Sequence, residues 1–332
     1  MTKTVLLTGI SGYIGLHCAQ QLLNAGYTVR GSVRSKIKEK EVLETLKAAS
    51  VNTKELFIIE LDLTSDIGWD NAAKNCDYIM HVASPFELAN PKKEDEMIIP
   101  AVEGTLRVFQ AAKNMGVNRV VLTSSIVAMI GSMKNGTFGP KDWTDITAKN
   151  INTYTKSKTL AEKTAWNFAK LNNIELVVIN PGGVFGPPLG KNLSGQSMSS
   201  LDQMLRGKLP MVPKIAFPMV DVRDVASLHV QALSNSDATG KRIVASTGQP
   251  NGFDTAAKIL IDAGYKGPST RIAPDFIFYL MAIFNREAKG MLGLLKTNLS
   301  ADNSETHTLF NWTPIPFKKS VLDTAKAVKA LQ

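Results

Sequence analysis

The chain has 332 residues, of which 44% are hydrophobic and 20% charged, and its mean hydropathy is −0.02. These values are typical of a folded globular protein and exclude a disordered one. The longest strongly apolar run, residues 276–284, is shorter than the ~20 residues that a membrane-spanning helix needs. Cys18 and Cys76 are the only cysteines, which excludes a disulfide framework and a multi-cysteine metal site. We therefore expect a cytoplasmic protein with no metal ion and no membrane partner.

The net charge permits an anionic ligand. Lys and Arg exceed Asp and Glu by 38 − 29 = +9. The basic residues are spread along the chain and often stand beside acids, as in "KIKEKEVLE" and "PKKEDE", which is typical of solvated helix faces. We therefore expect no nucleic-acid partner, since such a partner usually needs a continuous basic patch.

The first half of the chain alternates short apolar runs with amphipathic stretches. The runs are rich in Val, Ile and Leu, as strands buried on both faces are, and they cover residues 4–8, 28–32, 55–60, 78–83, 119–123 and 175–180. The clearest amphipathic stretch passes through Ile98, Val102, Leu106 and Phe109 and ends at "MGVN". Parallel strands need crossover connections, so this alternation predicts an α/β protein with a Rossmann-type, doubly wound parallel sheet.

Beyond Pro181 the pattern becomes irregular and rich in Gly, Pro and Ser. The segments "MVDVRDVASLHVQAL" and "GKRIVAS" then look like a return to the sheet. We expect a sheet domain of residues 1–182 and 219–247, interleaved with a smaller, mostly C-terminal substrate lobe of residues 183–218 and 248–332. Within "VDVRDVA" we expect Asp221, Arg223 and Asp224 to form structural ion pairs.

A glycine turn, "TGISGYIG", follows the first predicted strand. Gly9 allows a tight turn, Gly12 lets a diphosphate approach the backbone, and Gly15 lets helix and strand pack closely. Exposed N–H groups at the start of the following helix favour phosphate charge. The turn therefore predicts dinucleotide binding through Gly9, Ser11, Gly12, Tyr13, Ile14 and Gly15. A purely structural glycine turn is the alternative.

The end of the second strand indicates which dinucleotide is bound. An NAD site usually carries Asp or Glu there, but the chain has no acidic residue from Met1 through Lys38. Its sequence at that point, "VRGSVRSKIK", is basic. The guanidinium of Arg34 can bind a 2′-phosphate, with Lys38 about one helical turn further on. This pattern favours NADP(H), and a merely solvated basic turn is the alternative.

Further cofactor contacts are expected at the ends of the third and fourth strands. Asp62 and Leu63 follow the third strand, where a short acid can bind the adenine end, although Asp62 is equally suited to capping a helix. Ala83, in "HVASP", ends the fourth strand at the carboxyl edge, where open sheets bind ligands. We interpret His81 as a packed core histidine.

The fifth strand ends in Thr123-Ser124-Ser125, and "YTKSK" with Tyr154 and Lys158 follows. In chain order the sequence also contains "TGISGYIG", "VRGSVRS", "HVASP", "VVLTSS", "DWTD", "YTKSKTLAEKTAW", "NPGGVFGP" and "VDVRDVA". Over nearly its whole length the chain therefore resembles an extended short-chain dehydrogenase/reductase. It looks most like the dihydroflavonol reductase-like group, which includes cinnamoyl-CoA reductases and aldehyde or ketone reductases.

The residue types agree with this resemblance. Tyr154 and Lys158, four residues apart, lie on one face of a helix. A phenol has a pKa of ~10, and we expect the nearby ammonium to lower it. The resemblance implies that Tyr154 donates a proton to the carbonyl oxygen as hydride arrives from the nicotinamide. It also implies that Lys158 holds the ribose hydroxyls and that Ser125 binds the reacting oxygen, with Ser124 as the alternative.

The resemblance also implies roles for residues further along the chain. It places Pro181 and Val184 beside the nicotinamide and Ser200 near the cofactor phosphates. Where plant flavonoid reductases carry a polar residue, this chain has the apolar "IVAMIG", with Ile130. We therefore expect a small-molecule aldehyde or ketone as substrate, reduced by a monomer or homodimer. The alternatives are a dihydroflavonol- or cinnamoyl-CoA-type reductase, a nucleotide-sugar epimerase and a non-catalytic NADP-sensing regulator.

Overall fold

The computed structural model describes residues 2–85, 91–149, 151–191, 196–284 and 286–331. Its largest element is a seven-stranded sheet in the order β10-β7-β5-β4-β1-β2-β3, with every neighbouring pair parallel. The strands are β1 (Thr4–Thr8), β2 (Thr28–Val33), β3 (Leu56–Glu60), β4 (Tyr78–His81), β5 (Arg119–Thr123), β7 (Glu175–Pro181) and β10 (Arg242–Ala245). This order reverses beside β1, where doubly wound sheets bind their ligands.

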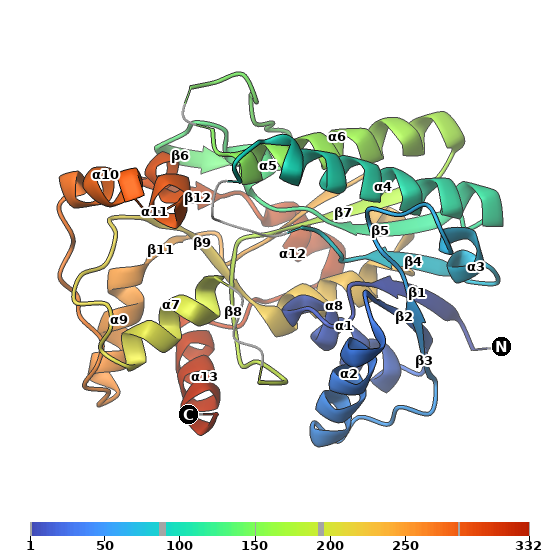
Figure 1. The fold of residues 1–332 in the computed structure, drawn as a ribbon, viewed down its shortest axis with the longest axis horizontal. Helices are drawn as coiled ribbons and strands as arrows, with labels where there is room; N and C mark the ends of the chain where they lie inside the picture. The colour runs from blue at the N-terminus through green and yellow to red at the C-terminus, as the bar shows by residue number, and fades with distance from the viewer. Residues whose placement is uncertain (1, 86–90, 150, 192–195, 285, 332) are drawn as a thin grey trace.

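Helices cover both faces of this sheet (Figure 1). One face packs against α1 (Tyr13–Asn24), α2 (Lys36–Ala48), α8 (Val222–Ala232) and α12 (Ser304–Phe310). The other packs against α3 (Trp69–Ala73), α4 (Asp95–Met115) and α6 (Thr153–Asn172), and the short α5 (Val127–Ile130) packs against α6. Side chains alternate along each strand, so Val5 and Leu7 belong to the first core and Leu6 to the second.

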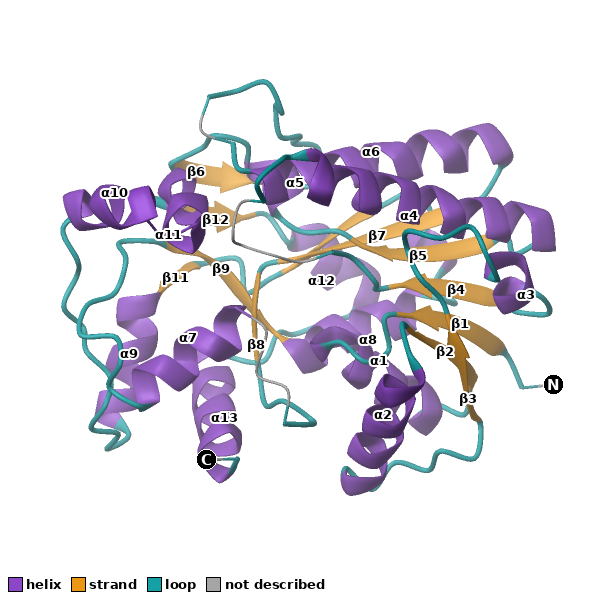
Figure 2. Ribbon diagram, viewed as in Figure 1, coloured by secondary structure: helices purple, strands orange, loops and turns teal. Residues whose placement is uncertain are grey.

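A second, smaller sheet lies beside the first (Figure 2). Its strands run β11-β9-β12-β6, with β8 also pairing with β9. They are β6 (Asn135–Phe138), β8 (Gly183–Phe185), β9 (Ala216–Asp221), β11 (Pro250–Gly252) and β12 (Asn298–Ala301). The helices on this side are α7 (Gln196–Leu205), α9 (Phe253–Asp262), α10 (Asp275–Phe284), α11 (Arg286–Met291) and α13 (Phe317–Ala330), with a 3-10 turn at Leu292–Leu294. Another 3-10 turn, Ser236–Ala238, follows α8, and its Ala238 belongs to the core of the large sheet.

The predicted α/β, Rossmann-type fold is confirmed, and the predicted strands coincide with the observed ones to within two residues. The chain nevertheless crosses between the two sheets more often than the predicted domain boundaries imply. β6 lies within residues 1–182 but pairs with β12, and the Phe310 and Trp312 side chains pack into the core of the large sheet. Such long-range pairings leave no trace in a local pattern such as "NGTF".

The predicted ion pairs of the "VDVRDVA" segment are present in part. Arg223 Nη2 lies 2.7 Å from Asp221 Oδ2 and 2.8 Å from Asp323 Oδ2, which joins α8 to α13. Asp224 is not in this network; it accepts hydrogen bonds from Trp312 Nε1 and the Ile315 N–H. Its carboxylate therefore fastens the segment after α12.

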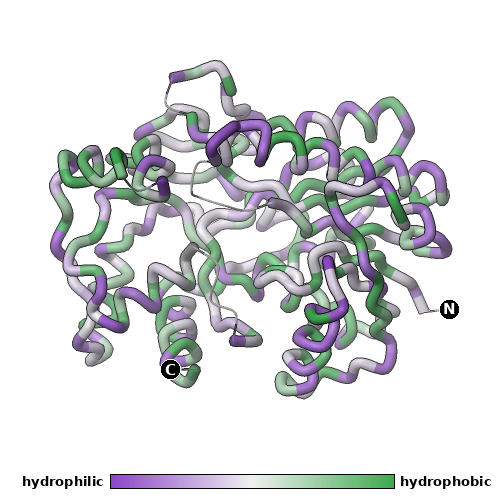
Figure 3. Tube along the Cα trace, viewed as in Figure 1, coloured by the Kyte–Doolittle hydropathy of each residue, from purple (hydrophilic) through white to green (hydrophobic). Residues whose placement is uncertain are grey.

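Apolar residues follow the strands of the large sheet, and a further apolar stretch runs along α10 (Figure 3). In α10, Phe276, Ile283 and Phe284 are exposed, while Phe278 is buried against the second sheet. Among the helices of the described ranges, none combines the length and the apolar character that crossing a membrane requires.

Candidate active site

The glycine turn joins the end of β1 to the start of α1. Gly9 has φ of +71°, and a Cβ there would lie 2.8 Å from the Ala83 Cα. A Cβ on Gly15 would collide with the Gly9 carbonyl oxygen. Gly12 is exposed and forms the N-cap of α1 in extended conformation. Each glycine thus has the environment that its predicted role requires.

The start of α1 suits a phosphate group. Its first turn carries no acidic residue, and the first N–H groups of a helix have no partner within it. The Tyr13 hydroxyl donates to the Gly186 carbonyl (2.7 Å), and Ile14 packs against the core. These side chains are engaged, and the Gly12 N–H donates to the Gly9 carbonyl (3.0 Å), so the backbone N–H groups at the start of α1 are what the turn offers a diphosphate. The donors present fit the diphosphate of a dinucleotide.

The predicted 2′-phosphate residues lie at the end of β2. Arg34 is exposed directly after the strand and near enough to Asp62 to help lower its pKa. Lys38 Nζ is paired with Glu41 Oε2 at 2.6 Å, so it must leave this partner to reach a phosphate. Arg34 can therefore reach a 2′-phosphate without breaking an ion pair, whereas Lys38 cannot.

The predicted residues after β3 and β4 lie at the carboxyl edge of the large sheet, like the end of β2. The Asp62 Oδ1 accepts hydrogen bonds from the N–H (2.8 Å) and the hydroxyl (2.7 Å) of Thr64, which lower its pKa, so it caps a turn here. Leu63 is buried against Gly104, and the Ala83 N–H donates to Thr8 Oγ1. Adenine binding by Asp62 and cofactor contact by Leu63 and Ala83 stay predictions.

Ser125, Tyr154 and Lys158 come together between β5 and α6. Ser125 follows β5, and its hydroxyl forms a hydrogen bond with the Tyr154 phenol while accepting one from the Val127 N–H (3.3 Å). Tyr154 and Lys158 belong to the first two turns of α6, which begins after Asn152, whose side chain accepts from the Thr155 N–H (2.8 Å). Two of the three predicted residues, Ser125 and Tyr154, are therefore in contact, and Lys158 lies one turn further along α6.

Ser124, the residue before Ser125, has a different partner on α6. Its hydroxyl donates to Glu162 Oε2 at 2.5 Å, inside the protein. Of the two serines, Ser125 is thus the one that contacts Tyr154.

The half-buried Tyr154 does not have the expected acidity. Burial raises its pKa to about 12, and the hydrogen bond from Ser125 offsets this only in part. The expectation that Lys158 lowers this pKa is wrong for this structure, because Lys158 Nζ instead points to the Thr123 carbonyl, 3.5 Å away. A neutral phenol is nevertheless the form that a proton donor needs.

Lys158 itself is strongly perturbed. Burial lowers its pKa to about 8, and the negative charge of Glu162 acts in the opposite direction. Nearby, His81 Nδ1 is hydrogen-bonded to Thr8 Oγ1 (2.7 Å), and burial, assisted by Lys158, lowers the His81 pKa to about 3. His81 is therefore neutral and buried, which confirms its interpretation as a core histidine.

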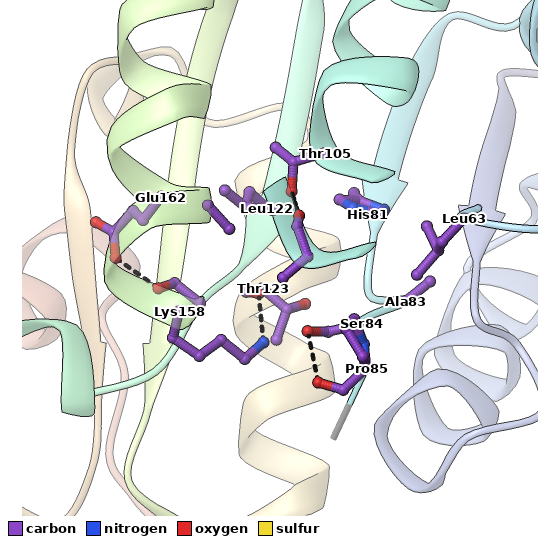
Figure 4. A pocket seen from close by; sticks show the side chains of 13 residues that line it. Leu63, His81, Ala83, Ser84, Pro85, Thr105, Leu122, Thr123, Lys158 and Glu162 are labelled. Atoms are coloured by element: carbon purple, nitrogen blue, oxygen red, sulfur yellow. Dashed lines mark hydrogen bonds between the residues drawn. The ribbon is translucent and has the colours of Figure 1, made fainter. Parts of the chain in front are cut away.

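A small pocket lies beside these residues, at the carboxyl ends of β4 and β5 (Figure 4). Lys158 crosses it toward Thr123, and Leu63 and Ala83 border it on the opposite side. Thr105 and Glu162 add polar groups from α4 and α6. The pocket thus connects the predicted catalytic lysine with two of the predicted cofactor contacts.

The remaining predicted residues lie further along the edge. The Pro181 carbonyl, at the end of β7, accepts from the Ile126 N–H (3.0 Å), and Val184 in β8 packs against the core cluster that also holds Ile14. Ser200 is half-buried in α7 of the smaller lobe. Their contacts with the cofactor stay predictions.

Sequence reasoning missed the buried polar residues behind the trio. Asn180 and Arg242 both donate hydrogen bonds to the Glu162 carboxylate there. The available signal was the acid in "YTKSKTLAE", one helical turn beyond Lys158 and on the same helix face.

Comparison with known proteins identifies the family. Residues 5–245 match the NAD dependent epimerase/dehydratase family, which is well over half of the chain. The chain belongs to this family. A cinnamoyl-CoA reductase of Medicago truncatula is 36% identical over 246 residues, covering 72% of this chain and 74% of that protein.

A sequence relative and a solved structure, both from Candida albicans, match over nearly the whole chain. One, named as an NADPH-dependent methylglyoxal reductase, is 30% identical, with 98% of each chain covered. The crystal structure of Gre2 in complex with NADPH has a TM-score of 0.79 at 28% identity, with 99% of each chain covered. The predicted resemblance to the extended short-chain dehydrogenase/reductases is confirmed.

Lys158 should titrate far below an ordinary lysine. Because burial lowers its pKa to about 8, the ammonium is present at neutral pH and is lost as the pH rises through about 8. The Cε chemical shift of Lys158 in isotope-labelled protein, assigned by comparison with Lys158→Arg, measures this. Lys3, whose pKa is raised by its hydrogen bond and ion pair with Asp77, is the internal control and should titrate later. Equal titration of the two lysines would contradict the burial of Lys158.

Proposed function

We propose that the protein is an NADPH-dependent reductase that transfers a hydride to an aldehyde or ketone and releases the alcohol. The observation that carries this is the hydrogen bond between Ser125 and Tyr154, one helical turn from Lys158, at the sheet edge that also holds the glycine turn. The reductase relatives that are at least 30% identical support the same reaction class.

NADPH bound at this edge would supply the hydride. The neutral phenol of Tyr154 donates its proton to the carbonyl oxygen, and the hydroxyl of Ser125 holds that oxygen. A buried phenolate is costly, as the pKa of about 12 shows, so Tyr154 keeps its proton until the carbonyl oxygen accepts it. Lys158, still charged at neutral pH, provides the donors for the ribose hydroxyls.

The choice of NADPH over NADH rests on the end of β2. The chain carries no acid from Met1 through Lys38, and Arg34 stands exposed directly after the strand. The carboxylate of Asp62 is turned toward Thr64. A nucleotide-sugar epimerase of the usual kind binds NAD, so this basic edge argues against that alternative. An NADP-sensing regulator would not need the Ser125–Tyr154 pair.

The substrate side is apolar. Ile130 is buried in a cluster with Met129, Phe138 and Leu299 between the two sheets, so the position where plant flavonoid reductases carry a polar residue is apolar and packed here. We therefore favour small aldehydes and ketones over flavonoids as substrates. Cinnamoyl-CoA esters are the second candidate, because the Medicago truncatula relative is named for them. We further propose that the protein acts in the cytoplasm as a monomer or homodimer.

A panel of carbonyl compounds tests the reaction. With aromatic and aliphatic aldehydes, simple ketones and α-dicarbonyls, the purified protein should oxidise NADPH and form the matching alcohol, because Ile130 stands, among apolar side chains, where plant flavonoid reductases carry a polar residue. Absorbance of NADPH and chromatography of the alcohol are the two readouts. Turnover of dihydroflavonols or cinnamoyl-CoA esters alone would assign the narrower activity, and consumption of no carbonyl compound would refute the reductase.

Arg34→Ala should weaken NADPH binding and leave NADH binding almost unchanged. A hydrogen bond to a charged group contributes ~1.5–3 kcal/mol, so the loss for NADPH should be roughly ten- to a hundredfold. Fluorescence titration with each cofactor measures both affinities. Lys47→Ala, which removes an exposed cation from the far end of α2, is the matched control. Equal losses for both cofactors would mean that Arg34 serves the fold instead.

A further inference from the structure

Glu162 is a fully buried acid behind the active site. It lies on α6, two turns after Tyr154 and one turn after Lys158. Its Oε2 accepts hydrogen bonds from Ser124 Oγ (2.5 Å) and Asn180 Nδ2 (2.9 Å), and its Oε1 accepts from Arg242 Nε (2.6 Å). A buried carboxylate with three donors, one of them a guanidinium, is held in one position.

The contacts of this carboxylate lead to the predicted catalytic residues. Asn180 Nδ2, which donates to Glu162, also donates to the backbone carbonyl of Ser125 (3.2 Å). Ser124, which donates to the same oxygen of Glu162, directly precedes Ser125 in the chain. On the same helix, the charge of Glu162 raises the pKa of Lys158 against the effect of burial. The Glu162 carboxylate thus holds Asn180, which binds the Ser125 carbonyl, and it also raises the pKa of Lys158.

Arg242 balances the buried charge and connects it to the smaller lobe. It lies in β10, at the edge of the large sheet, and is itself buried. Its Nη1 donates to the Pro140 carbonyl (2.9 Å), and its guanidinium stacks 3.8 Å from the centre of the Trp143 ring. The segment after β6 is therefore fastened to the same ion pair that lies behind the catalytic helix.

We propose that Glu162 is a positioning residue of the active site, which keeps Lys158 in its charged form and fixes the backbone of Ser125 through Ser124 and Asn180. The proposal rests on the proposed reductase function. Of the titratable groups that the structure describes around Lys158, Glu162 on α6 is the acid. His81 on β4 has a pKa of about 3 and Tyr154 one of about 12, so both are neutral at neutral pH.

The test begins with Glu162→Gln, which keeps the shape and removes the charge. Lys158 should then titrate at a lower pH than in the wild type, as read from its Cε chemical shift without substrate. The alkaline fall in kcat should move in the same direction. Since the Ser125 backbone loses its support, kcat at neutral pH should drop by roughly ten- to a hundredfold. Glu162→Asp, which retains the charge, should restore part of both properties.

Three further variants separate this role from a structural one. Arg242→Gln keeps the carboxylate, so Lys158 should titrate no lower than in the wild type. Glu162→Gln/Arg242→Gln removes both buried charges, which proteins tolerate better than one unpaired charge, and should still show the lowered Lys158 titration. Glu175→Gln breaks an ion pair with Arg119 at the opposite end of the strands and should not change the Lys158 titration.

The outcomes are distinct for the two proposals. A wild-type Lys158 titration in both Glu162→Gln and the double variant would overturn the positioning role, whatever happens to activity. A lowered titration in a protein that reduces no carbonyl compound would support the electrostatic link and refute the reductase function instead.

Discussion

The packing of α6 across the carboxyl end of β5 is the constraint on which the site depends. Ser125 leaves β5 at this point, and the first turns of α6 bring Tyr154 and Lys158 to it. The same sheet edge carries the glycine turn after β1, where the strand order reverses. The buried carboxylate of Glu162 joins α6 to Ser124 after β5 and to Asn180 in β7, so the predicted catalytic residues share one support.

Burial has opposite consequences for the two titrating groups of this site. It raises the pKa of Tyr154 to about 12 and so keeps its proton in place. It lowers the pKa of Lys158 to about 8, which brings the lysine close to losing its charge at neutral pH. A proton donor beside a cation therefore requires something that holds the cation charged, and Glu162 is the group placed to do so.

Local patterns predicted much of this. Strands buried on both faces are continuous apolar runs, which is why β1 and β5 could be located to the residue. The glycine turn and the Tyr154–Lys158 spacing were also visible, because their geometry is set within a few residues. Non-local contacts could not be predicted from such patterns. Glu162 pairs with Arg242, 80 residues further along the chain, and β6 pairs with β12 only in the folded protein. The acidity of Tyr154 could not be predicted either, since burial is a property of the fold.

The central claim is that Tyr154 is the general acid, and Tyr154→Phe tests it most directly. The change deletes the transferable proton but keeps the ring and the helix. We predict NADPH binding close to wild type by fluorescence titration, with turnover of the best carbonyl substrate lowered by ~10²–10⁴-fold, the usual contribution of general acid catalysis. Normal NADPH binding together with near-wild-type turnover would contradict the account.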